Sequence, residues 1–243
     1  MATRRRNSVA VCSAIIVVAL SSCTSRKQDV SGEKPDHLLS DGKVITKVGK
    51  MPESNTRLGE VVGVVDAPRE RVWKVISDYN EHKNFMPNIL ECFAIRPEAL
   101  ELLKGTSAQH LRTLESQLKQ YKTDRVTGAV VYMYGVGDFP WPIPDKAYVL
   151  KIARDPTRYI AQATMVIGQM KVNESSWELK PYGADGSKTL VKYTIRLDPG
   201  MPAPGFAVKM AASFTLPKVI EAVRRRVKDS KYGHPRRDKR KAG

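Results

Sequence analysis

The sequence predicts an α+β fold in which helices pack on an antiparallel sheet. Three observations predict this fold. A strand-like run at 56–67 leads directly into an amphipathic helix, about five further strand candidates follow after 126, and a long helix with an apolar stripe closes the pattern. The chain has 243 residues, which suits one folded domain with an extension at each end.

The N-terminus has the layout of a secretory signal. Three arginines precede an apolar run from Val9 to Leu20, which is short for a transmembrane helix, and small residues follow it. The segment LSSC at 20–23 resembles the lipobox of bacterial lipoproteins. This resemblance implies that 1–22 is a signal peptide that is removed and that Cys23 is acylated, for example with palmitate. The alternatives are an uncleaved anchor and a secreted protein with an incidental cysteine.

The same resemblance predicts a location in the bacterial cell envelope. Thr24 follows the cysteine where Asp would favour the inner membrane, so in a Gram-negative source we expect the periplasmic face of the outer membrane. Residues 23–55 contain many polar and few apolar residues, which predicts a flexible tether. Cys92 is then the one free cysteine, so we expect no intramolecular disulfide, and its apolar surroundings predict a buried side chain.

The first elements of the domain follow in order. The run TRLGEVVGVVDA is mostly apolar and predicts a strand, and helical spacing of Val72, Val75, Ile76 and Tyr79 predicts a helix after it. A short helical stretch, NEHKNFM, ends before Pro87, and NILECFAI predicts a second strand. Between 97 and 123, Leu111, Leu114, Leu118 and Tyr121 share one helical stripe.

The second half of the domain predicts a run of strands and a final helix. The strand candidates span 127–136, 146–154, 158–167, 171–180 and 187–198, each bounded by Pro, Gly, Asp or Asn. The last alternates strictly, with Thr189, Val191, Tyr193, Ile195 and Leu197 on one face, as in a half-buried antiparallel strand. The closing helix carries one apolar stripe, made of Phe206, Met210, Phe214, Ile220, Val223 and Val227.

The basic charge is concentrated at the C-terminus. The formal net charge is +16, and residues 224–243 hold ten Lys or Arg against two Asp. We therefore expect 230–243 to be a disordered basic tail, either only solvated or drawn to anionic lipid. This charge lacks interleaved aromatic residues and follows an export signal, so we do not expect a nucleic-acid partner.

Four segments resemble the START-like superfamily of lipid-transfer domains, coenzyme-Q-binding proteins and polyketide cyclases. They are VVDAPRERVWKVISDYNEHKNFMP, DFPWPIPDKAYVL, SSWELKP and LVKYTIRLDPGMPAPGF, and they occur in the family's order between about 56 and 229. The resemblance implies a helix-grip fold, in which a curved antiparallel sheet wraps the C-terminal helix around an apolar cavity. It also marks 97–123 as a helical insertion, which either packs outside the sheet or forms a lid or partner surface.

The implied cavity would bind a phospholipid, a quinone or a similar hydrophobic molecule, with no cofactor. The predicted cavity residues are mostly aromatic or methionine, and the same set would also suit a plain core. Lys146 stands where lipid-transfer members often carry Arg. The cavity candidates are Tyr132, Tyr134, Trp141, Lys146, Met165, Trp177, Tyr193, Phe206, Met210 and Phe214.

The sequence gives little support for catalysis. The four histidines are scattered without metal-ligand spacing or a Ser-His-Asp order, and no Gly-rich phosphate loop occurs. The alternative function is a cyclase- or dehydratase-like enzyme that places a Tyr or Glu in the same cavity. Its candidates are Tyr132, Tyr134, Glu174, Glu178 and Tyr193.

Overall fold

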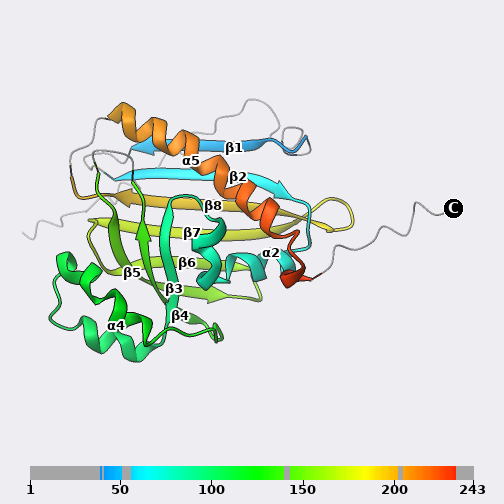
Figure 1. Ribbon diagram of the computed structural model, residues 1–243. Helices are drawn as coiled ribbons and strands as arrows, with labels where there is room; N and C mark the ends of the chain where they lie inside the picture. The colour runs from blue at the N-terminus through cyan, green and yellow to red at the C-terminus, as the bar shows by residue number, and fades with distance from the viewer. Residues whose placement is uncertain (1–38, 40, 51–55, 140–142, 202–204, 234–243) are drawn as a thin grey trace, which may run out of the picture. The chain divides into compact units, whose positions relative to one another are not determined.

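The computed structural model describes residues 39, 41–50, 56–139, 143–201 and 205–233, with the backbone alone for 205–214. These residues form an eight-stranded sheet of order β1-β2-β8-β7-β6-β5-β4-β3, and every neighbouring pair is antiparallel. The sheet curves strongly, because β3, β4 and β5 run across the direction of β1, β2 and β8 (Figure 1). The predicted α+β class is confirmed.

The bounds of the strands agree with the sequence pattern from β2 onward. The runs predicted at 56–67 and 88–95 and the five later candidates each became one strand. The strands are β1 Val44–Lys50, β2 Arg57–Val65, β3 Ile89–Ile95, β4 Val130–Gly137, β5 Lys146–Asp155, β6 Ile160–Gly168, β7 Val172–Tyr182 and β8 Lys188–Asp198.

Strand β1 corrects the predicted tether. Val44–Lys50 pairs with β2 along its whole length, from Val44 opposite Gly63 to Lys50 opposite Arg57, and packs against the closing helix. A flexible tether that runs to residue 55 is therefore wrong for 44–50. The strand was missed because β1 is an edge strand with little buried surface, and because 23–55 as a whole contains few apolar residues.

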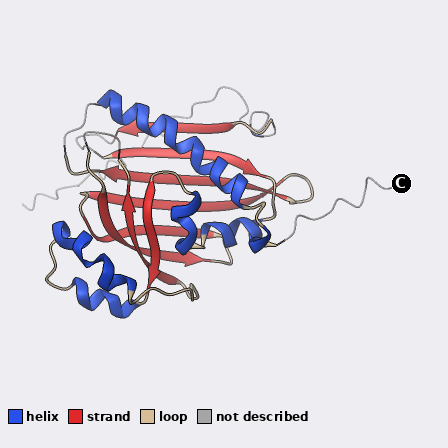
Figure 2. Ribbon diagram, in the orientation of Figure 1, coloured by secondary structure: helices blue, strands red, loops and turns tan. Residues whose placement is uncertain are grey.

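Helices α2, α3 and α5 lie on the inner face of the curved sheet (Figure 2). Helix α2, Arg69–Ile76, follows β2, and η1, Tyr79–Glu81, and α3, His82–Phe85, lead to β3. Helix α5, Gly205–Arg226, packs against β1 and β2, and α2 packs against both α5 and β7. The predicted stripes of α2 and the second half of α5 are buried, with Val72, Val75, Ile220 and Val223 fully so.

Two glycines of β2 allow α5 to lie close to the sheet. A Cβ added at Gly59 would lie 2.8 Å from Cδ1 of Leu216, and one at Gly63 would lie 2.7 Å from Cγ2 of Ile220. Real Cβ atoms do not approach other carbons so closely, so any side chain at these positions would displace the helix. The position of α5 against the sheet depends on these two glycines, and so does the width of the space between the helix and the sheet.

We predict that Gly63→Ala destabilises the fold. The new methyl group overpacks the contact with Ile220, which typically costs about 1–3 kcal/mol of unfolding free energy. Equilibrium urea unfolding measures this loss. Gly49→Ala is the matched control, because a Cβ at Gly49 would meet no atom within 4 Å. Equal stability of the two variants would contradict the account of this contact.

The insertion at 97–123 packs on the outer face of the sheet. It forms η2 Pro97–Leu103, η3 Ala108–Leu114 and α4 Glu115–Lys119, with the helix end at Gly105 in the left-handed region, φ +75°. Leu111 and Leu118 are fully buried in a second apolar cluster with Phe93 and Tyr134. Of the two predicted roles, the structure shows the one in which this segment packs outside the sheet.

The folded region also extends beyond the predicted boundary at 229. Ser230–Tyr232 forms η4, and the Tyr232 side chain is only 6% exposed. The hydroxyl of Tyr232 donates to Oδ2 of Asp78 at 2.8 Å, and Nε of Arg71 donates to the Tyr232 carbonyl at 3.3 Å. A disordered tail that begins at 230 is therefore wrong for 230–232, while 234–243 lies outside the described residues.

None of the helices in the described ranges is long and apolar enough to cross a membrane.

Candidate functional site

An apolar cavity of about 290 Å³ lies between the inner face of the sheet and the helices. This volume is just below the usual range for small-molecule sites, roughly 300–1,000 Å³. Leu216 and Val219 of α5 and the segment from Tyr79 to Ile89 form its other walls. The sheet contributes Met133, Tyr148, Leu150, Ile152, Ala161, Ala163, Asn173, Ser175, Trp177, Tyr193, Ile195 and Leu197.

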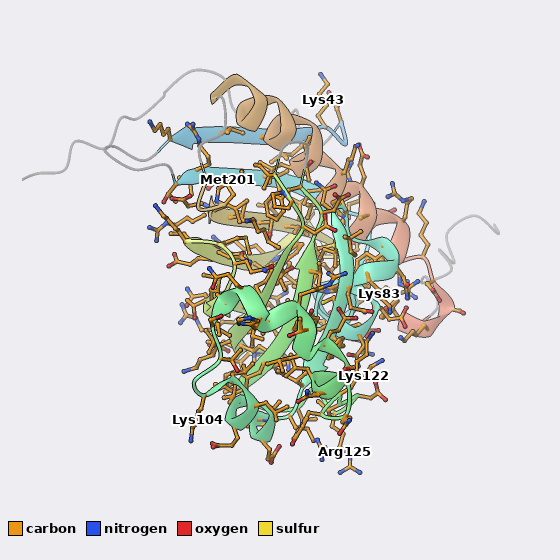
Figure 3. All side chains as sticks on the ribbon, turned by 60° about the vertical axis from the view of Figure 1, so that its left-hand side comes forward. Lys43, Lys83, Lys104, Lys122, Arg125 and Met201 are labelled. Atoms are coloured by element: carbon orange, nitrogen blue, oxygen red, sulfur yellow. The ribbon has the colours of Figure 1, made fainter. Side chains whose placement is uncertain are left out.

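The cavity opens at one end of the sheet. Its exposed lining residues, Leu58, Asn88 and Asp138, all lie where β2 and β3 begin and β4 ends. Met201 lies at this same end, just after β8 (Figure 3). Phe139 and Ile143 of the proline-rich segment DFPWPIPDKAYVL also line the cavity. The residues between them, 140–142, lie outside the described residues.

Aromatic rings form much of the wall. The Trp177 and Tyr193 rings pack at a centroid distance of 4.5 Å on neighbouring strands β7 and β8. The Tyr148 ring lies over Gly135 of β4, where an added Cβ would be 2.6 Å from the ring. Gly135 is therefore required for the position of Tyr148. Burial raises the pKa of both tyrosines, that of Tyr193 to about 12, so both hydroxyls are neutral at physiological pH.

His82 is the one histidine among the residues that line the cavity. It is 5% exposed, and its Nε2 lies 3.0 Å from the carbonyl oxygen of Ile76, which assigns the proton to Nε2. Burial lowers the pKa of His82 to about 4, more strongly than the Ile76 carbonyl and Asp78 raise it. His82 is therefore a neutral wall residue at physiological pH.

We predict that the burial of His82 makes the domain less stable in mild acid. Its pKa is lowered in the folded state from an ordinary value of 6.5, so the unfolded chain binds the extra proton. Stability therefore falls as the pH drops from about 6.5 toward 4, by up to about 3 kcal/mol. Unfolding by urea at several pH values measures this. His82→Gln should flatten the decline between pH about 6.5 and 5, and an unchanged slope would contradict the assignment.

The sequence of this chain matches the model of a known protein family. The model of the family described as "Polyketide cyclase / dehydrase and lipid transport" matches residues 65–224, more than half of the chain. The chain belongs to this family. The matched range contains every strand of the cavity wall from β3 to β8 and nearly all of α5. A search among curated proteins found no match.

Solved structures of START-like proteins share the fold. The STAR-related lipid transfer protein of Xanthomonas axonopodis is 15% identical, with 76% of this chain and 94% of that chain covered and a TM-score of 0.55. The Zhui aromatase/cyclase of a Streptomyces species is 12% identical, with 74% and 99% covered and a TM-score of 0.52. At these identities the likeness establishes the helix-grip fold of this START-like domain.

Two of the predicted cavity residues line the cavity of the START-like domain. They are Trp177 and Tyr193, which lie on the inner faces of β7 and β8. Their contact with a ligand stays a prediction. Met165 packs against the inner cluster without lining the cavity, and Lys146 begins β5 opposite Gly137 and is likewise not part of the lining.

The prediction that Tyr132 and Tyr134 line the cavity is wrong. Both belong to the cluster on the outer face of the sheet, under the insertion, and the Tyr134 hydroxyl donates to Oε2 of Glu115 at 3.1 Å. The inner face of β4 carries Val131 and Met133 instead. The assignment failed because both faces of β4 are covered, so both carry apolar residues and the alternation does not reveal which face is inside.

The glutamates proposed for an enzyme are also outside the cavity. Oε2 of Glu174 lies 2.7 Å from Nη1 of Arg196, and Oε1 of Glu178 lies 2.8 Å from Nζ of Lys180. Their neighbours Ser175 and Trp177 line the cavity, so Glu174 and Glu178 point to the opposite face of β7. An enzyme that uses either glutamate in this cavity is therefore not supported.

The remaining candidates cannot be placed. Trp141 and Cys23 lie outside the described residues, as do the side chains of Phe206, Met210 and Phe214. Cys92 is free and 1% exposed, and burial raises the pKa of its thiol, so the prediction of a buried side chain is confirmed. Within the described ranges, no cluster of His, Cys, Asp and Glu could hold a metal ion.

Several cavity residues were missed. Asn173 and Ser175 share the face of Trp177 on β7, so the alternation of that strand contained the signal. Tyr148 and Met133 lie on strands that are covered on both faces, where no such signal exists. Tyr79 and His82 enter the wall only because the chain folds back over β3.

Proposed function

We propose that this START-like domain binds a hydrophobic molecule in its cavity and carries it at the surface of a membrane. The observation that supports this proposal is the apolar cavity that opens at one end of the sheet. Transfer of a ligand's apolar surface from water into this wall contributes about 25 cal/mol per Å². A phospholipid, a quinone or a similar molecule would supply such surface.

The mouth has the composition of a membrane-contacting surface. Three of the four large hydrophobic side chains that are exposed in the described part of the chain, Leu58, Leu90 and Val166, lie on strand ends at the mouth. The exposed Lys50 and Lys171 lie at the same ends of the sheet. Apolar residues beside lysines are typical of surfaces that contact anionic lipid.

The predicted lipoprotein signal would attach the domain permanently to a membrane. Acylation of Cys23 would hold the domain in the cell envelope, on the periplasmic face of the outer membrane in a Gram-negative source. Residues between the lipid and the buried Leu39 would then serve as a shorter tether than expected. The basic residues of 234–243 would add attraction to anionic headgroups.

A vesicle assay tests the carrier function. Donor vesicles contain a fluorescent acyl-chain probe, acceptor vesicles contain none, and the full chain is added at catalytic amounts. We expect transfer to accelerate, and to accelerate more with phosphatidylglycerol than with phosphatidylcholine alone at low salt. Leu90→Glu should slow transfer without loss of probe binding. A chain that binds no probe and accelerates nothing would refute the proposed function.

A further inference from the structure

The described part of the chain begins at the end of the sheet that lies opposite the mouth. Strand β1 runs antiparallel to β2, with Val44 opposite Gly63, so it starts where β2 ends. The N–H of Gly42 donates to the Leu39 carbonyl at 3.1 Å, and this turn holds Leu39 close to the start of β1. Since the cavity opens where β2 begins, the chain enters the domain on the far side from the mouth.

Helix α5 brings the last described residues to the same end. It starts after β8, which ends at the mouth, and it packs along β1 and β2. Near the C-terminus of α5, Nε of Arg224 donates to the Val64 carbonyl at 2.8 Å, where β2 ends. The following η4 then packs against α2. Figure 3 shows Met201 at the mouth and Lys43 at the opposite end of the sheet.

Basic side chains are exposed at this opposite end. Lys43 precedes β1, and Arg225 and Lys228 lie at and just after the end of α5. None of the three forms an ion pair within the described part of the chain. Exposed acids such as Asp66 lie there too, so the positive surplus comes chiefly from 234–243, which hold five Lys or Arg against one Asp. Anionic lipid would therefore attract the end at which both termini attach.

The length of the predicted tether favours one orientation of the domain. Sixteen residues separate Cys23 from Leu39, and a flexible linker of this length spans roughly 22 Å on average. Strand β8 has 11 residues, which makes the sheet about 37 Å long from the mouth to the opposite end. Turning the mouth toward the anchoring membrane would require a tether that spans this whole length, well beyond its average. The mouth therefore faces away from the anchor.

We propose that the protein works between two lipid surfaces. The end with both termini rests on the membrane that holds the acylated Cys23, and the mouth contacts a second, anionic membrane. This inference rests on the proposed function. The exposed apolar side chains and the two lysines of the mouth fit such a surface. The cavity then exchanges its ligand with the second membrane and not with the membrane that holds the anchor.

Two labelled variants of the full, acylated chain test this orientation. Lys43→Cys and Lys50→Cys place a thiol at the two ends of β1, about 23 Å apart, and each removes one exposed lysine. Cys92 is buried and Cys23 carries the lipid, so a thiol-reactive bimane labels only the new cysteine. The chain is reconstituted in vesicles that contain phosphatidylglycerol. A nitroxide lipid, which quenches bimane at contact, is placed either in these vesicles or in second vesicles of the same composition.

With the quencher in the anchoring vesicles, the label at position 43 should lose at least about twofold more fluorescence than the label at position 50. With the quencher in the second vesicles, this order should reverse. The second quenching should also weaken at high salt, because salt screens the attraction between the lysines and anionic lipid. Circular dichroism checks that both variants fold as the wild type does.

Two results would overturn this inference while the same preparation still accelerates probe transfer and the proposed function stands. One is a label at position 50 that is quenched more from its own vesicles than from the second ones. The other is a label at position 50 that neither vesicle quenches, which would leave a protein as the partner of the mouth. If the chain does not stay on its vesicles, the inference falls with the anchor. If it also fails to bind and transfer the probe, the proposed function falls as well.

Discussion

Replacing Ala163 by Trp is expected to abolish ligand binding while the domain still folds. Ala163 lies on the inner face of β6, 7% exposed, and lines the cavity beside Ser175. An indole ring there would occupy space that the proposed ligand needs, and affinity for the fluorescent probe N-phenyl-1-naphthylamine should fall by at least about tenfold, or 1.4 kcal/mol. Since the ring enters a cavity and not a packed core, the cost in stability should stay below about 3 kcal/mol.

Thr164→Trp is the control for this substitution. Thr164 is the next residue of β6 and is exposed on the opposite face of the sheet. This variant should bind the probe as the wild type does. If Ala163→Trp folds and keeps full affinity, the ligand lies somewhere other than in this cavity.

Replacing Cys23 by Ala is expected to release the protein from the membrane. A lipobox cysteine carries the acyl chains, and stable anchoring depends on them, because each buried methylene contributes about 0.8 kcal/mol. Fractionation of cells should move the variant from the membrane pellet to the soluble fraction. Labelled palmitate should enter the wild type and be absent from the variant.

Cys12→Ala is the control, since the predicted signal peptide that contains Cys12 is removed. It should leave both the membrane attachment and the labelling unchanged. A Cys23→Ala variant that stays in the membrane, together with an unlabelled wild type, would favour the uncleaved anchor that the sequence left open.

Local patterns in the sequence were sufficient for most of the fold. Strands β2 to β8 and helices α2 and α5 follow from apolar periodicity and from the Pro, Gly and Asn residues that separate them. Trp177 and Tyr193 were placed correctly because charged residues alternate with them, Glu178 on β7 and Lys192 on β8, and mark the opposite face of each strand.

The errors arose where long-range packing decides. The outer face of β4 is apolar because a segment some twenty residues earlier covers it. Tyr132 and Tyr134 were therefore predicted to line the cavity in place of Met133. Strand β1 has few buried residues and depends on its pairing with β2. Tyr232 is buried through contacts with Asp78 and Arg71, more than 150 residues away in sequence. No local window of sequence contains these partners.

Native mass spectrometry tests the central claim most directly. The full chain is purified with mild detergent from the membranes of the cells that make it, and whatever leaves the protein on activation is extracted and identified. We predict one hydrophobic molecule per chain, retained by Thr164→Trp and lost from Ala163→Trp. A wild-type chain that is empty as isolated, and that takes up no ester, quinone or phospholipid when these are offered, would contradict the account.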